Sequence, residues 1–356
     1  MMSETKLHRR LSAAKRSFVT RRVDLQCVEA LIEKPPKAGD ICLARIDRLG
    51  HHSRLELPSG RRAFLYPGDE VLLAFGARYA TDQFCSEVPA NLEPCQMVAA
   101  GGIASAMLSR HAKTRQPTQI TPISLLADAK GNTVNLNGFA VNPDRAFHPQ
   151  RPHIVAVVGS SMNAGKTTTA AEVGRAALRG GLRTGAIKLT GTGSGGDLWK
   201  YQDSGIDPVF DFTDGGYATT VDVSIASLEI LFNRLVNAAA ASCDIIIVEL
   251  ADGLYQKETD GLLHSPSFRA SIDSILFAAS DPMAGMAGVQ ALREIGLEPS
   301  ALSGAVTASP LAAQELESLS GVEVFGLQRF AADDNALSIC MRSAHVFEEQ
   351  RLAKSA

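Results

Sequence analysis

The first part of the chain has the hydrophobic pattern of short β-strands. Apolar runs at 41–46 and 71–75 each follow a Gly-Asp pair. The turn Pro58-Ser-Gly60 separates two further runs, 54–57 and 63–66, and this arrangement predicts a β-hairpin. Short strands at such spacing are typical of a small barrel or sandwich. A fold of this kind does not by itself indicate a function.

Further along, the pattern predicts a helix over 103–113 and a second hairpin from 121–126 and 133–136. The segment 142–152 carries three prolines and no apolar period, so we place a domain boundary there. The sequence therefore predicts a mainly-β N-terminal domain over 36–148.

From residue 153 the hydrophobic pattern changes, because short apolar runs typical of strands now alternate with helical periodicity. The expected strands are 154–158, 184–189, 244–248, 274–279, 302–307 and 322–327, and the expected helices are 166–180, 223–242, 284–295 and 311–319. Alternation of this kind predicts an α/β domain with a mostly parallel sheet covered by helices on both faces. We assign this domain to 153–335 and expect a helical tail over 336–356.

The composition limits the number of domains and the classes of partner, but it does not indicate a function. A chain of 356 residues favours two domains, and 45% hydrophobic with 21% charged residues is ordinary for a soluble protein. The net charge of −3 gives no field that would attract nucleic acid or a membrane, and the apolar runs are too short to span a bilayer. Six cysteines without a C-x-x-C pair indicate reduced thiols in a cytoplasmic protein.

The N-terminal segment 1–35 is unusually basic. Within its first 22 residues, seven lysines and arginines face a single acid, Glu4, and no apolar stretch resembles a secretory signal. A transit peptide, a nucleic-acid-binding arm and a solvated, frayed terminus are all compatible with this pattern. We favour the last.

The strongest chemical signal follows the strand 154–158. There the chain reads Gly-Ser-Ser-Met-Asn-Ala-Gly-Lys-Thr-Thr and continues into a helix, which predicts a phosphate-binding P-loop with one residue more than usual between its glycines. Lys166 is expected to reach the β- and γ-phosphates, and the Thr167 hydroxyl to bind magnesium. The residues expected to contact the nucleotide here are Gly159, Ser160, Ser161, Met162, Asn163, Ala164, Gly165, Lys166, Thr167 and Thr168.

Two further segments carry polar residues at predicted strand ends. Glu249 ends the apolar run 244–248, where an acid beside a P-loop can hold magnesium. Lys188 leaves another strand into a loop rich in glycine and hydroxyl groups that reaches Asp197. This loop has the hydrogen-bonding groups to surround a polar substrate, although a linker and an N-cap role for Asp197 are the simpler alternatives. The aromatic residues Trp199 and Tyr201 are expected to pack the following helix.

The long P-loop, Lys188, Asp197 and Glu249 together resemble dethiobiotin synthetase and the synthetase part of cobyric acid synthase, P-loop NTPases of the SIMIBI class. The resemblance covers about residues 153–330. The chain departs from the family pattern, since Ser160 replaces a threonine, Leu189 replaces a proline, and Glu249-Leu-Ala-Asp-Gly253 stands where the family has Glu-Gly-x-Gly-Gly. The amidotransferase half of cobyric acid synthase has no counterpart.

The resemblance implies roles for particular residues. Thr167, Asp197 and Glu249 would surround Mg²⁺, while Lys166 and Lys188 would act in catalysis by stabilising charge on the transferring phosphoryl group. Thr307 and Ser309 stand where the family reads the nucleotide base with an asparagine, so ATP is the default and GTP stays open. The residues that we expect to contact the substrate are Thr190, Thr192, Ser194, Asp252 and Tyr255.

The sequence thus predicts an ATP- and magnesium-dependent synthetase or ligase that activates a small, carboxylate-bearing substrate; a kinase is a close variant. The alternative is a nucleotide-hydrolysing switch or chaperone whose N-terminal domain docks a protein partner. The polar loop between Lys188 and Asp197 favours the enzyme, and the unassigned N-terminal domain favours the switch. We also expect a homodimer in the cytoplasm with no membrane contact; a nucleic-acid partner of the N-terminal domain stays open.

Overall fold

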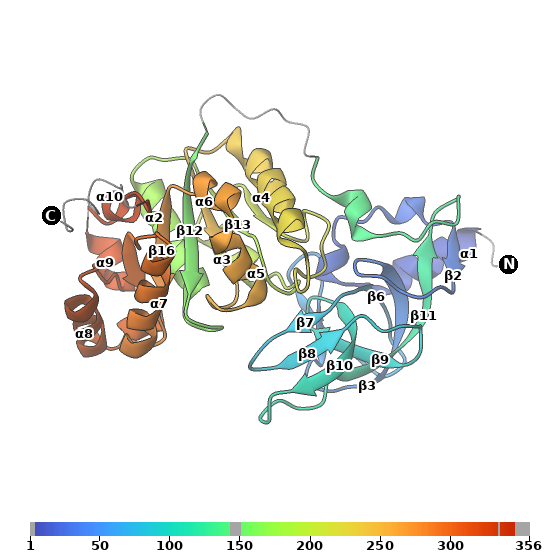
Figure 1. Ribbon diagram of the computed structural model, residues 1–356. Helices are drawn as coiled ribbons and strands as arrows, with labels where there is room; N and C mark the ends of the chain where they lie inside the picture. Colours follow the sequence, from blue (N-terminus) through green and yellow to red (C-terminus); the bar gives the residue numbers. More distant parts are fainter. Residues whose placement is uncertain (1–3, 143–150, 334, 346–356) are drawn as a thin grey trace. The chain divides into compact units, whose positions relative to one another are not determined.

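The computed structural model describes residues 4–142, 151–333 and 335–345, and the chain forms two compact units. The first unit contains residues 1–141 together with the segments 191–199 and 212–222. The second contains 142–190, 200–211 and 223–356. Strands predominate in the first unit, and helices flank a central sheet in the second (Figure 1).

Five strands of the first unit close into a barrel. They are β3 (Ile41–Arg48), β6 (Glu70–Phe75), β9 (Cys95–Ala99), β10 (Ile103–Arg110) and β11 (Thr118–Ala127). The order β6-β3-β11-β9-β10 is antiparallel throughout, and a parallel pairing between β10 and β6 closes the ring. Buried apolar side chains such as Leu73, Met97 and Ile120 form its core. The expected small barrel is confirmed.

Short elements surround this barrel. They are α1 (Glu4–Ala13), β1 (Lys15–Arg16), β2 (Ala30–Ile32), β4 (Arg54–Glu56), β5 (Arg62–Phe64), β7 (Arg78–Tyr79), β8 (Phe84–Glu87) and the 3₁₀ turns η1 (Phe18–Thr20), η2 (Leu25–Cys27) and η3 (Leu136–Phe139). Strands β4 and β5 pair antiparallel around the turn at Gly60, so the hairpin expected there is confirmed.

The helix expected over 103–113 is wrong, because its first eight residues are strand β10. This stretch contains good helix formers such as Ala106 and Met107 and few β-branched residues. In the barrel, however, Ile103 and Ala104 are fully buried, and the strand pairs with β9, β8 and β6. Pairing partners distant in sequence outweigh a local preference of this size.

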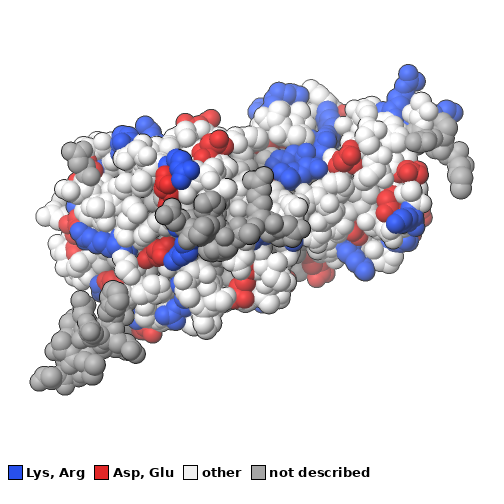
Figure 2. Space-filling view, turned by 90° about the horizontal axis from the view of Figure 1, so that it is seen from above, with Lys and Arg blue, Asp and Glu red and all other residues white. Residues whose placement is uncertain are grey.

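From residue 4 onward the basic N-terminal segment is folded, so the expectation of a frayed terminus is wrong for its described residues. Leu7 and Leu11 of α1 are buried at 3% and 1% exposure. Arg10 pairs with Glu70 at 2.5 Å, and Lys15 pairs with Asp69. These ion pairs anchor part of the basic charge within the first unit. On the face seen in Figure 2, basic and acidic side chains are interspersed.

The second unit is built on a parallel sheet of six strands, as predicted. Its order is β14 (Val209–Asp211), β13 (Thr184–Lys188), β15 (Ile245–Glu249), β12 (His153–Gly159), β16 (Ser274–Ala278) and β17 (Ala301–Ser303). The strand expected at 322–327 is reduced to a single parallel bridge between Leu302 and Val324. Strand β14 was not expected from the sequence.

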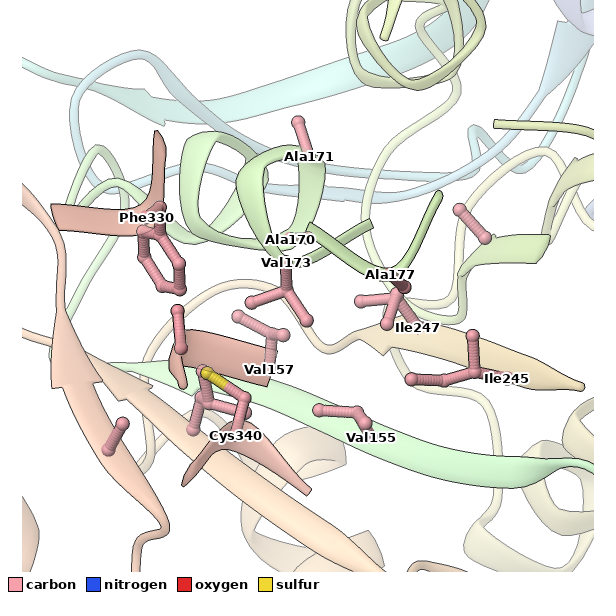
Figure 3. Close-up of a cluster of buried hydrophobic side chains, with 14 of the residues drawn as sticks. Val155, Val157, Ala170, Ala171, Val173, Ala177, Ile245, Ile247, Phe330 and Cys340 are labelled. Atoms are coloured by element: carbon pink, nitrogen blue, oxygen red, sulfur yellow. The ribbon is translucent and has the colours of Figure 1, made fainter. Parts of the chain in front are cut away.

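Helices cover both faces of this sheet. The helices after β12 are α2 (Lys166–Arg179), α3 (Gly196–Asp203, of which 196–199 belong to the first unit), α4 (Ile225–Ala240), α5 (Lys257–His264), α6 (Pro266–Ser271), α7 (Pro282–Glu294), α8 (Pro310–Ser320), α9 (Leu327–Ala332) and α10 (Ala336–Cys340), with the 3₁₀ turn η4 (Ala305–Ala308). Both alternating sets of β12 side chains are buried, as expected for a central strand with two covered faces. Figure 3 shows Val173 of α2 and Phe330 of α9 in one apolar cluster with Val155 and Val157.

Helix α10 covers the first part of the expected helical tail, and residues 346–356 lie outside the described residues. In the described part of the chain, no helix combines the length and apolar character needed to cross a membrane.

The glycine-rich segment 191–199 is packed into the first unit. Gly193 N–H donates to the Ala218 carbonyl at 3.0 Å, which joins this segment to 212–222. The Glu56 carboxylate, 1% exposed, accepts from Gly195 N–H at 3.1 Å and from the Trp199 indole at 2.7 Å. The segment is therefore an ordered part of this unit and not a flexible linker.

Candidate functional site

The P-loop of the second unit joins β12 to α2 as the sequence predicts. Both flanking glycines stand where a side chain would not fit. A Cβ on Gly159 would lie 2.8 Å from the Ala278 carbonyl oxygen, and one on Gly165 would lie 2.9 Å from the Gly304 Cα. Gly165 also has φ of 99°, in the left-handed region that favours glycine. Helix α2 begins at the next residue, so the loop ends at a helix N-terminus, where anions are stabilised.

Lys166 is only 5% exposed and lies at the mouth of this loop. Its ammonium donates to the Ser161 carbonyl at 2.8 Å and to the Asp252 carbonyl. Burial lowers the pKa of Lys166 from its ordinary value, and the nearby Glu249 carboxylate opposes that shift. The ammonium is therefore held by main-chain oxygens that phosphate oxygens can replace.

Glu249, the last residue of β15, is 2% exposed and gathers three side chains. Its Oε1 accepts from the Thr167 hydroxyl at 3.1 Å and lies 3.9 Å from the Lys188 ammonium. Its Oε2 accepts from the Tyr201 hydroxyl. Lys188 and Glu249 are register partners on adjacent parallel strands, so both strands end at the edge that carries the P-loop, as predicted.

Tyr201 is a site residue that sequence reasoning missed. Its side chain is fully buried, and burial, reinforced by the Glu249 charge, holds the pKa of the phenol well above its usual range. The hydroxyl thus stays a proton donor to Glu249. The burial of Tyr201 agrees with the expectation that this residue packs its helix. The hydrogen bond to Glu249 was not predicted, because nothing in the sequence relates Tyr201 to a residue 48 positions away.

The donor set suits a magnesium ion. The Thr167 hydroxyl and the Glu249 carboxylate offer hard oxygen ligands side by side, which Mg²⁺ prefers. No cluster of three His, Cys, Asp or Glu side chains able to hold a metal occurs among the described residues. In the usual Mg²⁺ site, one or two protein oxygens are joined by phosphates and water in the coordination shell. Asp197 lies in the first turn of α3, and its role as a magnesium ligand stays a prediction.

The residues predicted to contact substrate lie in different settings. Thr190 is fully buried, and its hydroxyl bonds to both main-chain groups of Ala251, at 2.7 and 2.8 Å. Thr192 forms a bridge with Thr219, and Ser194 donates to Glu56 at 3.4 Å. Asp252 contacts Lys166 through its carbonyl, whereas Tyr255 is 78% exposed.

A pocket of about 590 Å³ opens beside the P-loop in the second unit. Its walls come from the start of α2, the η4 turn and the start of α9, and the lining residues are Gly165, Thr168, Thr169, Ser303, Gly304, Ala305, Thr307, Ala308, Pro310, Gly326, Leu327 and Gln328. Thr307, expected to read the base, is among them. Ser309 is not; it caps α8 by accepting from Ala312 N–H at 3.3 Å. A volume of this size fits a small ligand.

Comparisons with known proteins add little to this geometry. No protein-family model matches the chain, and no curated protein matches it significantly. Among solved structures, it is similar to the signal recognition particle receptor FtsY from Elizabethkingia anophelis in complex with GDP, with 18% identity and a TM-score of 0.32 over 47% of this chain and 52% of that one. FtsY from Mycoplasma mycoides gives 13% identity and a TM-score of 0.35 over 53% of this chain and 68% of that one. The chain thus spans about half of the first receptor, and scores this low do not establish a common activity.

Proposed function

We propose that the protein is a magnesium-dependent P-loop nucleoside triphosphatase that uses ATP. The observation that carries the proposal is the convergence of Lys166, Thr167 and Glu249 at the start of α2. A buried ammonium, a hydroxyl and a buried carboxylate at the end of a glycine-bounded loop are the groups that triphosphate chemistry requires.

In this proposal, some groups of the site bind the phosphates and others stabilise the negative charge on the γ-phosphoryl group. The main-chain N–H groups of the loop and the N-terminus of α2 would bind the phosphates. Lys166 would neutralise charge on the γ-phosphoryl group, and Lys188, 3.9 Å from Glu249, would supply a second cation on the neighbouring strand. Thr167 and Glu249 would hold Mg²⁺, which when bound supplies charge neutralisation on the phosphate oxygens. Tyr201 would keep the Glu249 carboxylate oriented.

The first candidate for the fate of the phosphoryl group is transfer to an oxygen of a small substrate, as in a synthetase or ligase. Lys188 favours this function, because simple hydrolysis does not need a second lysine beside the metal-binding carboxylate. A carboxylate-bearing substrate is the natural acceptor, since its phosphoanhydride would be an activated acyl group.

The second candidate is a nucleotide-driven switch. The packing of segment 191–199 favours it, because this segment begins three residues after Lys188 and belongs to the other compact unit. Exchange of the triphosphate for the diphosphate beside Lys188 would then move the chain that leads into segment 191–199. The Glu56 hydrogen bonds, at 3.1 and 2.7 Å, define the state that would change.

Two substitutions separate these candidates. For phosphoryl transfer we expect Asp197→Asn and Lys188→Ala to slow turnover and Asp197→Asn to raise the magnesium requirement, with little change in melting temperature. The measurement is phosphate release against magnesium concentration, with and without a panel of small carboxylic acids, one of which should stimulate strongly. Normal turnover of both variants at low magnesium, with no stimulating acid, would favour the switch.

The pocket beside the P-loop bears on the choice of base. Its lining residues include no carboxylate that could accept the two N–H groups of a guanine edge, whereas the Gln328 amide both donates and accepts, as an adenine edge requires. We expect ATP to bind roughly 10-fold more tightly than GTP and Gln328→Leu to remove most of that difference, since a hydrogen-bond pair of this kind is worth about 1 kcal/mol or more. Competition binding with both nucleotides measures it. Equal affinities in the parent protein would contradict the assignment.

A further inference from the structure

Lys200 is a cation beside the P-loop to which neither the sequence pattern nor the proposed catalysis gives a role. It lies on α3, and its ammonium donates to the Thr168 hydroxyl at 2.5 Å. The side chain is half-buried, and no aspartate or glutamate in the described parts of the chain pairs with it. An ammonium that donates to a neutral hydroxyl can also donate to a phosphate oxygen, and a hydrogen bond to a charged acceptor is the stronger of the two.

The position of Thr168 locates this cation relative to the rest of the site. Thr168 lines the pocket beside the P-loop, whereas its neighbour Thr167 donates to Glu249. The Lys200 ammonium therefore reaches a residue of the pocket wall, although Lys200 itself is not a lining residue, whereas Lys188 lies beside Glu249. A nucleotide with its base in the pocket would place its innermost phosphate near Thr168.

The helix that carries Lys200 is held firmly. The next residue, Tyr201, is fully buried and donates to Glu249, so the backbone at Lys200 is fixed to the same carboxylate as Thr167. A fixed backbone lowers the entropy lost when the lysine side chain binds a phosphate. The geometry is that of a prearranged binding group.

We propose that Lys200 binds the α-phosphate of the nucleotide, as a third cation beside Lys166 and Lys188. The inference rests on the proposed nucleotide-binding function of the same site. The Lys200 ammonium donates to an oxygen of the α-phosphate, either in place of its hydrogen bond to Thr168 or in addition to it. A role limited to fastening α3 onto α2 through Thr168 is the competing account.

The test is nucleotide binding to the full-length chain carrying Lys200→Met, with Lys200→Arg and the exposed Lys130→Ala as matched variants. Dissociation constants for AMP, ADP and ATP are measured by calorimetry. We expect Lys200→Met to weaken all three by the same factor, about 10- to 100-fold, because each nucleotide has the α-phosphate. Lys200→Arg should restore most of the affinity, and Lys130→Ala should change nothing.

The other outcomes are distinct. Unchanged dissociation constants with a lower melting temperature would show that Lys200 only fastens the helix. Weaker binding of ATP alone would move the contact to the outer phosphates and overturn the assignment. Absence of nucleotide binding by the parent protein would instead contradict the proposed function itself.

Discussion

Replacement of Lys166 by alanine is expected to slow nucleoside triphosphate hydrolysis by about 100- to 1,000-fold, the usual cost of losing one charge-stabilising group. The ammonium is 5% exposed and held by the carbonyls of Ser161 and Asp252, and alanine would remove it from this position. The loop itself is built from main chain and glycine, so we expect its conformation to survive.

Phosphate release under saturating magnesium measures this effect, and Lys130→Ala serves as the control for loss of a lysine elsewhere. Melting temperatures of both variants should stay close to that of the parent protein. Hydrolysis by Lys166→Ala at the parent rate would remove the catalytic assignment. A collapse of stability would show that the buried ammonium has a structural role.

Glu249→Gln is expected to have the second large effect. The amide keeps the shape of the side chain and one acceptor oxygen for Thr167, but it removes the negative charge that a magnesium ion requires. We expect a higher magnesium requirement and a turnover reduced at least 10- to 100-fold, roughly the cost of disturbing the outer partners of a metal site. Magnesium titrations of hydrolysis measure both quantities.

Tyr201→Phe provides a graded companion to that variant. It removes the hydroxyl that donates to Glu249 Oε2 while leaving the charge, so the magnesium requirement should rise less than in Glu249→Gln. A parent-like magnesium requirement in Glu249→Gln would exclude Glu249 from the metal site, and the phenylalanine variant would then be expected to change stability alone.

The parts of the fold that sequence predicted well are those with a strong local pattern. The central strands are runs of Ile and Val, and the loop between Gly159 and Lys166 has glycines where backbone amides must converge. Strand β14 has three residues and sits at the edge of the sheet, too short for a periodicity to register. Strand β10 was misassigned because its preference is set by barrel partners far away in sequence.

The glycine-rich segment after Lys188 shows a different limit. Sequence alone suggested flexible glycines or a substrate loop, because glycine is permissive in conformation. In the structure, Gly193 and Gly195 are needed for space: added Cβ atoms would lie 2.3 Å from Val19 Cγ1 and 2.4 Å from Trp199 Nε1. A glycine required because neighbouring atoms leave no room for a Cβ cannot be told from the sequence apart from a glycine that provides backbone flexibility.

The placement of 191–199 and 212–222 in the first unit also constrains how the chain folds during synthesis. Arg21 donates to Asp214 at 2.6 Å across 193 positions of sequence. The buried Glu56 has no Gly195 or Trp199 to bond until residues 195–199 have been synthesised. The N-terminal barrel leaves the ribosome first, yet its last packing partners are translated only after β12, α2 and β13. Contacts this distant in sequence form slowly. We therefore expect the first unit to be translated early and completed late, with a partly uncovered barrel as the intermediate that chaperones would meet.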